Sequence, residues 1–254
     1  TINQGDTSYT NITACDSLVW NGTTYDSSGT YSYSGVASNS YSMSFDGVDD
    51  YIDYGVNNEF DFGIGDFTIQ AWIRPSNINQ NARIVARGPS NIAGCYQMNI
   101  LPNGVFRITF HDIEEYSSSN VIQSNVWQHL VVIRENNIVK GYVNGVEVIS
   151  FFNSMNLTSS DVLEIGRQPG YDTYFNGKID DVSIWNTALT EQEIQNYMNC
   201  PPTGSETGLV GYWNFEQGSG TTAYDQTSNG NNGTINGANY DTNVPLQSCA
   251  LTNA

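Results

Sequence analysis

The chain has 254 residues, of which 39% are hydrophobic, and its 5 Trp, 16 Tyr and 10 Phe are enough to build the core of a folded domain. Only 8 Lys and Arg face 26 Asp and Glu, and the formal net charge of −18 disfavours nucleic acids and anionic membranes as partners. No apolar run reaches the roughly 18 residues of a membrane helix, so we expect no membrane insertion.

The N-terminal 40 residues differ in amino-acid composition from the rest of the chain. They are rich in Ser, Thr and Tyr and carry few aliphatic side chains. We therefore expect residues 1–40 to form an extension or hairpin packed on a main domain spanning 41–254. Because the chain starts at Thr1 without a signal peptide or an initiator Met, we expect a mature or excised piece of a longer protein.

The main region alternates apolar and polar residues with a period of two. In "FTIQAWIRP" (67–75) the alternation places Phe67, Ile69, Ala71 and Ile73 on one side. Tight turns that accept positive φ follow at Asn103–Gly104, Asn136–Asn137 and Asn144–Gly145. Short strands joined by frequent turns predict an all-β antiparallel sandwich or barrel.

One short helix is predicted near residue 190. Thr190 caps the segment "EQEIQNYM", and Glu193, three residues later, completes a capping box. Ile194, Tyr197 and Met198 form its apolar stripe.

Several segments carry a family resemblance. "SMSFDGVDDYIDYG", "DFTIQAWIRP" and "GKIDDVSIWNTALTEQEI" resemble a laminin-G-like domain of the concanavalin A-like lectin/glucanase superfamily, from about Tyr41 to Asn199. The resemblance implies a jelly-roll β-sandwich. The N-terminal "ACDSLVWNGTTYDSSGTYSYSG" resembles the short Cys-Asp-Ser repeats of large secreted bacterial surface proteins.

The order of the segments departs from that family. "GLVGYWNFEQGSGTTAYDQTSNGNNGTING" (208–237) resembles a segment that normally precedes "FDGVDDY", yet here it comes last. Either it begins a truncated second copy or it closes the single domain. The 17 residues that follow Gly237 are too few for a second sandwich. We therefore expect residues 208–248 to supply permuted closing strands to a monomer, with a domain-swapped dimer as the variant.

The same resemblance implies a structural calcium ion. Asp225, Asn229 and Asn231 lie on a Gly-bent loop, and the family's pattern joins such a loop to an aspartate of the "IDD" strand, here Asp180 or Asp181. Strict alternation also turns one of these two aspartates towards the apolar side, where a carboxylate needs a partner. The alternative is a turn that binds no metal. The acidic residues of the chain then serve its solubility.

A second oxygen-rich sequence lies in "FDGVDDY", with Asp46, Asp49 and Asp50. A tight turn explains it as well as a cation site does.

The four cysteines lack the CxxC spacing of zinc sites. Cys200 and Cys249 bracket the C-terminal segment and are the expected disulfide pair. Closing a loop of about 50 residues stabilises by roughly 4 kcal/mol in the chain-entropy model. Such a bridge predicts a secreted or cell-surface setting. Cys95 is expected to be a buried thiol, and Cys15 either pairs with it or lacks a partner.

Catalytic patterns are absent from the sequence. The strands best placed for paired carboxylates, "QMNILP", "VFRITF" and "HLVVIR", contain no Asp or Glu. The chain has only two histidines, His111 and His129, so few Ser/His or Cys/His catalytic triads can form. We therefore expect no enzymatic activity from this chain.

Aromatic and polar residues mix on three loops, a composition typical of sugar binding. The predicted ligand-binding residues are Arg87, Tyr96, His111, Glu115, Tyr116, Arg167, Tyr171 and Tyr174.

The sequence therefore predicts a non-catalytic, calcium-stabilised carbohydrate-binding module of a secreted or cell-surface bacterial protein, with a polysaccharide as partner. The alternative is an adhesion or structural spacer domain with a protein ligand or none. A neutral glycan fits the acidity best, because a uronate-rich or sulfated one needs bridging Ca²⁺ or a local gathering of arginines.

Overall fold

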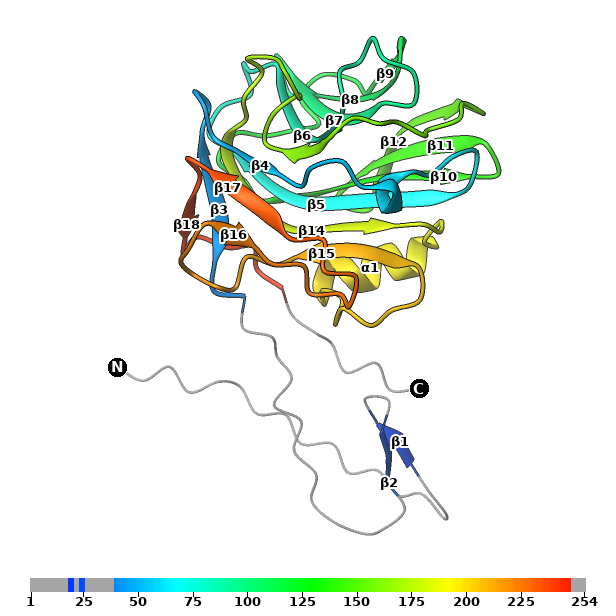
Figure 1. Cartoon of the computed structure of the whole chain (residues 1–254), viewed down its shortest axis with the longest axis vertical. Helices are drawn as coiled ribbons and strands as arrows, with labels where there is room; N and C mark the ends of the chain where they lie inside the picture. The colour runs from blue at the N-terminus through cyan, green and yellow to red at the C-terminus, as the bar shows by residue number, and fades with distance from the viewer. Residues whose placement is uncertain (1–17, 21–22, 26–38, 248–254) are drawn as a thin grey trace. The chain divides into compact units, whose positions relative to one another are not determined.

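Two eight-stranded antiparallel sheets form the main unit of the structure (Figure 1). The computed structural model describes residues 18–20, 23–25 and 39–247. Contacts divide the chain into residues 1–36 and 37–254. In the first unit, β1 (Leu18–Trp20) pairs with β2 (Thr23–Tyr25) as a small hairpin. Most of the predicted 1–40 extension lies outside the described residues, as do Cys15 and Cys249.

Sheet I has at its centre the long strands β5 (Phe67–Pro75), β10 (Gln128–Glu135) and β14 (Asn176–Trp185). Its strand order is β12 (Val146–Phe152), β11 (Ile138–Val143), β10, β5, β14, β3 (Ser42–Asp46) and β18 (Asn239–Asp241), with β15 (Leu209–Trp213) also on β14.

Sheet II is built around three consecutive hairpin strands, β6 (Ala82–Arg87), β7 (Tyr96–Leu101) and β8 (Val105–Phe110). Its strand order is β16 (Thr222–Ala223), β17 (Gly233–Asn236), β4 (Tyr51–Asp53), β13 (Leu163–Ile165), β6, β7, β8 and β9 (Ile113–Tyr116).

The core lies between the two sheets. Phe67, Ile69, Ala71 and Ile73 of β5 all belong to it, as the alternation predicted, and they meet side chains such as Met98 from sheet II. The antiparallel sandwich with one short helix is therefore confirmed.

Local signals in the sequence also predicted the turns and the helix. The three predicted turn pairs have positive φ, for example 65° at Asn103 and 64° at Gly104. The helix α1 (Glu191–Asn199) begins at Thr190, which with Glu193 forms the predicted capping box. A short 3₁₀ helix, η1 (Asn58–Phe60), precedes β5.

The C-terminal strands pair with strands of the same chain (Figure 1). β15 pairs with β14, β17 with β4, and β18 with β3, so both sheets receive strands from residues after 208. Whether this order arose by circular permutation stays a prediction, and so does the domain-swapped variant.

A bulge in β14 decides where its two aspartates point. Pairing with β5 is interrupted after Asp180, and Asp181 has a left-handed φ of 45°. The extra residue resets the alternation, so Ile179 and Val182 both reach the core. Asp181 instead bonds Tyr212, which belongs to a separate cluster beneath the helix. The bulge therefore keeps both carboxylates out of the core between the sheets, although both are buried and have hydrogen-bond partners.

Candidate functional site

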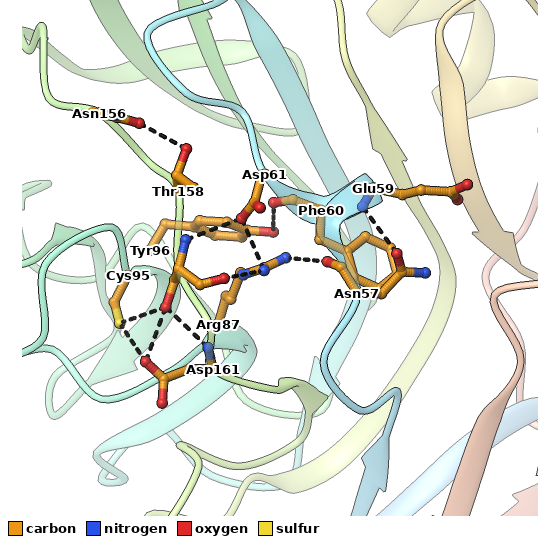
Figure 2. Close-up of polar contacts among 11 residues, drawn as sticks. Asn57, Glu59, Phe60, Asp61, Arg87, Cys95, Tyr96, Asn156, Thr158 and Asp161 are labelled. Atoms are coloured by element: carbon orange, nitrogen blue, oxygen red, sulfur yellow. Dashed lines mark hydrogen bonds and ion pairs between the residues drawn. The ribbon is translucent and has the colours of Figure 1, made fainter.

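Two of the predicted binding residues, Arg87 and Tyr96, lie in the interior. Arg87 is fully buried and pairs with Asp61 at 2.8 Å (Figure 2). Its guanidinium also donates to the carbonyls of Asn57 (2.7 Å) and Ser159 (2.6 Å). The hydroxyl of Tyr96, which is 1% exposed, donates to the Phe60 carbonyl. Neither side chain reaches a ligand at the surface, because both hold the η1 segment against sheet II.

Cys95 belongs to the same interior network (Figure 2). Its thiol lies 3.9 Å from the Ser159 hydroxyl and 3.7 Å from an Asp161 oxygen, and it is a free cysteine. Burial raises the pKa of the Cys95 thiol to about 11. A thiol in this environment stays protonated and is a poor nucleophile.

Three other predicted residues lie near the outer edge of sheet II. His111 has a left-handed φ of 51° and its Nε2 lies 3.5 Å from Asp112. Tyr116 stands directly opposite Arg107 on the neighbouring strand, whereas Glu115 stands opposite Ile108, a core residue. Because paired residues share a side of a sheet, Glu115 and Tyr116 point to opposite sides.

Arg167 forms a local cluster with neighbouring strands. Its Nε and Nη2 hold the Glu164 carboxylate side-on, with 2.8 Å for the Nε contact. Its guanidinium stacks 3.5 Å above the Tyr51 ring and lies 5.8 Å from that of Tyr174. Tyr171 is 46% exposed.

The outward side of β6–β9 is polar and is organised in two cross-strand rows. The inward side chains of these strands, such as Met98 and Ile108, belong to the core. Directly opposite one another on the outward side are Arg83, Asn99, Arg107 and Tyr116 in one row and Ala86, Gln97, Thr109 and Glu114 in the next. We call the polar members of these two rows the polar face.

Hydrogen bonds connect the polar face along and across the rows. Arg83 donates from Nε to Gln97 (3.2 Å), and Asn99 donates from Nδ2 to Thr109 (2.9 Å). Arg107 pairs through Nη1 with Glu114 at 2.9 Å, and the Tyr116 hydroxyl donates to the same carboxylate. The interior of this network is almost closed to solvent, since Asn99 is 0% exposed.

Three atoms at the centre of the polar face have no partner. They are the Nε and Nη2 of Arg107 and the Oδ1 of Asn99. Unpaired buried polar atoms are costly, so they mark a place where a further group completes the network. The charge is also unbalanced here, because Arg83 has no ion pair among the described residues and Glu114, whose charge acts on both arginines, pairs with Arg107. Burial, and then the charge of Arg107, lowers the pKa of Arg83 to about 10.

Glu164 extends the polar face towards the Arg167 cluster. It stands opposite Ala86 on one side and Asp53 on the other, in the second row. The structure therefore brings Tyr116 and, through Glu164, Arg167 to one side of sheet II. The candidate binding residues that sequence reasoning missed are Arg83, Asn99 and Arg107. The available signal was the alternation of polar with apolar residues in three consecutive hairpin strands.

The predicted calcium loop is closed by its own hydrogen bonds. Asp225 accepts four of them, from the backbone nitrogens of Tyr212, Thr227 and Asn231 and from the Thr227 hydroxyl. Asn229 donates its amide to the Val210 carbonyl at 2.8 Å. The Asp225 oxygens fix the turn by accepting these bonds, and calcium binding on this loop stays a prediction.

Asn231 is also engaged within the protein. Its Nδ2 donates to Glu59 at 2.7 Å and to the Val210 carbonyl at 2.9 Å, and its Oδ1 accepts from Asn57 at 2.6 Å.

Asp180 and Asp181 lie in a buried acidic cluster of their own. Asp180 accepts from Asn39 (2.9 Å), and Asp181 accepts from Tyr212 (2.6 Å) and Gln247 (2.7 Å). Burial, and then the neighbouring Asp181, raises the pKa of Asp180 well above its usual range. Burial raises the pKa of Asp181 to about 6, and the charge of Glu216 adds to the rise.

Asn39 and Glu216 are neighbours of these two aspartates. Glu216 accepts from the backbone nitrogens of Ser40 and Tyr41, next to Asn39. The Asn39 Oδ1 is buried without a partner, although its Nδ2 donates to both Asp180 and Gln247. Carboxylate and amide oxygens are the donors a hard cation prefers, and in this structure all four oxygens of Asp180 and Asp181 accept hydrogen bonds within the protein.

The Asp46, Asp49 and Asp50 group is compact but mostly exposed. One oxygen from each lies within 4.8 Å of the others. Asp46 accepts from the Val48 nitrogen at 2.7 Å, and Asp50 accepts from the Asp46 nitrogen at 2.8 Å. These bonds are those of a tight turn.

The fold and this polar sheet face define a jelly-roll domain of the lectin-like type. A family model described as the concanavalin A-like lectin/glucanases superfamily matches residues 46–195. The chain belongs to that family, as the resemblance implied.

Solved structures share the fold. A Bacteroides ovatus ATCC 8483 protein with a proposed role in carbohydrate binding is similar over 83% of this chain and 62% of its own, with a TM-score of 0.68 and 21% identity. A heptameric SAP-like pentraxin from Limulus polyphemus covers 84% of this chain and 98% of its own, with a TM-score of 0.58 and 14% identity.

A curated relative is the Danio rerio adhesion G-protein coupled receptor V1, 22% identical over 167 residues. The match covers 61% of this chain and 3% of the receptor, so the chain corresponds to a small part of it. Among the described residues, no helix is both long and apolar enough to span a membrane.

Proposed function

We propose that the chain is a non-catalytic carbohydrate-binding module and that the polar face of sheet II is its binding surface. The observation that carries this proposal is the cross-strand row of Arg83, Asn99, Arg107 and Tyr116, in which hydrogen-bonding side chains surround unpaired atoms. Sugars present donors and acceptors at close spacing, and an exposed aromatic at the rim supplies a stacking surface. Tyr116, which is 49% exposed, is that aromatic.

The carboxylates on this side of the sheet support a binding role over a catalytic one. Glu114 is paired with Arg107, and Glu164 is held by Arg167. A glycosidase needs one carboxylic acid and one free carboxylate flanking the scissile bond. Both of these glutamates are held by arginines instead.

The Bacteroides ovatus protein, which shares this fold, supports a role in carbohydrate binding. The setting we propose is a secreted or cell-surface bacterial protein. The expected partner is a polysaccharide.

Retention on polysaccharide affinity gels tests this function. Wild-type protein is expected to be retarded by at least one glycan, and Tyr116→Ala to lose much of that retardation. Phe152→Ala is the matched control, because Phe152 is 66% exposed but belongs to sheet I. If wild-type protein migrates freely through every glycan tested, the module is a structural spacer.

We also propose that Ca²⁺ stabilises the fold at the Asp180, Asp181 and Glu216 cluster, with the Asn39 Oδ1 as a further ligand. Bound there, the ion would neutralise buried carboxylates that otherwise repel one another. Asn39 and Gln247 lie close to the two ends of the main unit, so the ion would fasten both ends to β14.

Thermal unfolding in EDTA and in added Ca²⁺ tests the calcium site. The midpoint of wild-type protein is expected to rise by several degrees with Ca²⁺. Asp181→Asn should abolish this rise, whereas Asp225→Asn should lower the midpoint equally in both conditions, because Asp225 fixes a turn. If the unfolding midpoint of Asp225→Asn no longer rises with Ca²⁺, the calcium site lies on the 225–231 loop.

A further inference from the structure

The two unpaired nitrogens of Arg107, Nε and Nη2, can bind a carboxylate side-on, and we call this pair of nitrogens the fork. The side-on edge of a guanidinium consists of Nε and Nη2, whose N–H bonds run parallel and match the two oxygens of a carboxylate. Arg167 uses this same edge to hold Glu164. In Arg107 the same two atoms are buried and have no partner, because Glu114 occupies only Nη1.

A second arginine faces the same position. Arg83 and Arg107 flank Asn99 from the two neighbouring strands, which places their Cα atoms about 10 Å apart across the sheet. Among the described residues Glu114 is the one carboxylate paired with either of them. In a chain of net charge −18 this row therefore holds a local positive surplus.

Asn99 indicates that the anionic ligand must also contain a hydrogen-bond donor. Its Nδ2 is used by Thr109, and its Oδ1 is a buried acceptor that requires a donor. An inorganic sulfate ion offers acceptors only. An acidic sugar offers a carboxylate for the guanidinium and ring hydroxyls that donate to an amide oxygen.

We propose that the polar face recognises the carboxylate of an acidic sugar, with Arg107 as the fork, Arg83 as the second cation and Asn99 as the acceptor for a neighbouring hydroxyl. This assignment rests on the proposed glycan-binding function and names its ligand class. It replaces the neutral glycan that overall acidity favours. The fork lies below the surface, and the exposed Tyr116 stands beside it as the stacking surface.

Paired ligands provide the test. Binding of the full chain to polygalacturonate, alginate and sialyllactose is measured by calorimetry, each beside its carboxyl-reduced counterpart, with dextran sulfate and neutral glucans as further arms. We expect at least tenfold tighter binding of one acidic glycan than of its carboxyl-reduced form. Equal affinity for the two forms, or binding of dextran sulfate alone, overturns the carboxylate assignment while the glycan-binding function stands. Binding to no glycan overturns both.

Two variants separate recognition from folding. Arg107→Gln should lose the preference for the acidic glycan, whereas Arg74→Gln, the same charge change on sheet I, should keep it. Asn99→Asp places a carboxylate between the two arginines, so it should raise the midpoint of unfolding and abolish binding of the acidic glycan. An Asn99→Asp protein that is folded and still prefers the acidic glycan would refute the assignment.

Discussion

His129 gives this domain a built-in sensitivity to acid. The imidazole is 1% exposed, it packs 5.3 Å from the ring of Trp72, and its Nδ1 has no hydrogen-bond partner. Burial lowers the pKa of His129 from 6.5 to about 3. The folded protein therefore keeps this side chain neutral at a pH where the unfolded chain protonates it.

The sign of the effect follows from proton linkage. Between pH 6.5 and about 3 the unfolded state binds one proton more than the folded state at this position, so the free energy of unfolding rises with pH. From pH 7 to pH 5 the contribution of His129 falls by about 2 kcal/mol, because the limiting slope of about 1.4 kcal/mol per pH unit is reached only below pH 6.5.

Urea unfolding at pH 7, 6 and 5 measures this contribution as a difference between proteins. His129→Gln should lose about 2 kcal/mol less than wild type over that range. Asp180 and Asp181 titrate with the opposite sign, because their pKa values are raised, but they are present in both proteins and cancel. His111→Gln, which removes the other histidine of the chain, is the control for the substitution itself. Parallel curves for wild type and His129→Gln would refute the reasoning.

Three further predictions follow from single contacts. Arg87→Leu removes the ion pair with Asp61 and the donors to two backbone carbonyls, so it should cost roughly 3–5 kcal/mol in urea unfolding without changing glycan affinity. A specific loss of affinity would contradict its interior role. Gly104→Ala should destabilise more than Gly170→Ala. Both glycines have positive φ, but a Cβ at 104 meets a carbonyl oxygen at 2.2 Å and one at 170 meets nothing within 4 Å; equal midpoints of unfolding would be unexpected. Cys95 should resist iodoacetamide at pH 8 until urea unfolds the chain, because the pKa of its thiol is raised to about 11. Mass spectrometry of the Cys95 peptide measures the labelling, and rapid labelling of folded protein would show an accessible thiolate.

The sandwich could be predicted from the sequence because its determinants are local. Alternation along residues 67–75 fixed the buried side of β5, and left-handed turn residues such as Asn103 fixed the hairpins. The capping box at Thr190 placed the helix start within one residue. Each of these signals operates over a few residues, which a linear reading captures.

The site could not be predicted in the same way because it depends on register. Arg83, Asn99 and Arg107 lie on three strands, and only the pairing of β6, β7 and β8 brings them into one row. Reading loops one at a time favoured Arg87 and Tyr96, whose side chains the η1 segment covers. A bulge cannot be read from alternation either, because one left-handed residue, Asp181, shifts every later side chain in the strand.

The net charge of the protein and the local pair of arginines act on the ligand over different distances. At physiological ionic strength the Debye length is about 8 Å, so exposed carboxylates elsewhere on the surface are largely screened from a glycan that approaches the polar face. The buried guanidinium of Arg107 is screened much less, and its fork acts within hydrogen-bonding distance. Net charge therefore governs how fast an acidic polymer approaches, while the local pair of arginines governs how long it stays. An acidic protein with cations gathered on one sheet face would reject non-specific polyanions yet retain a sugar acid that fits that face.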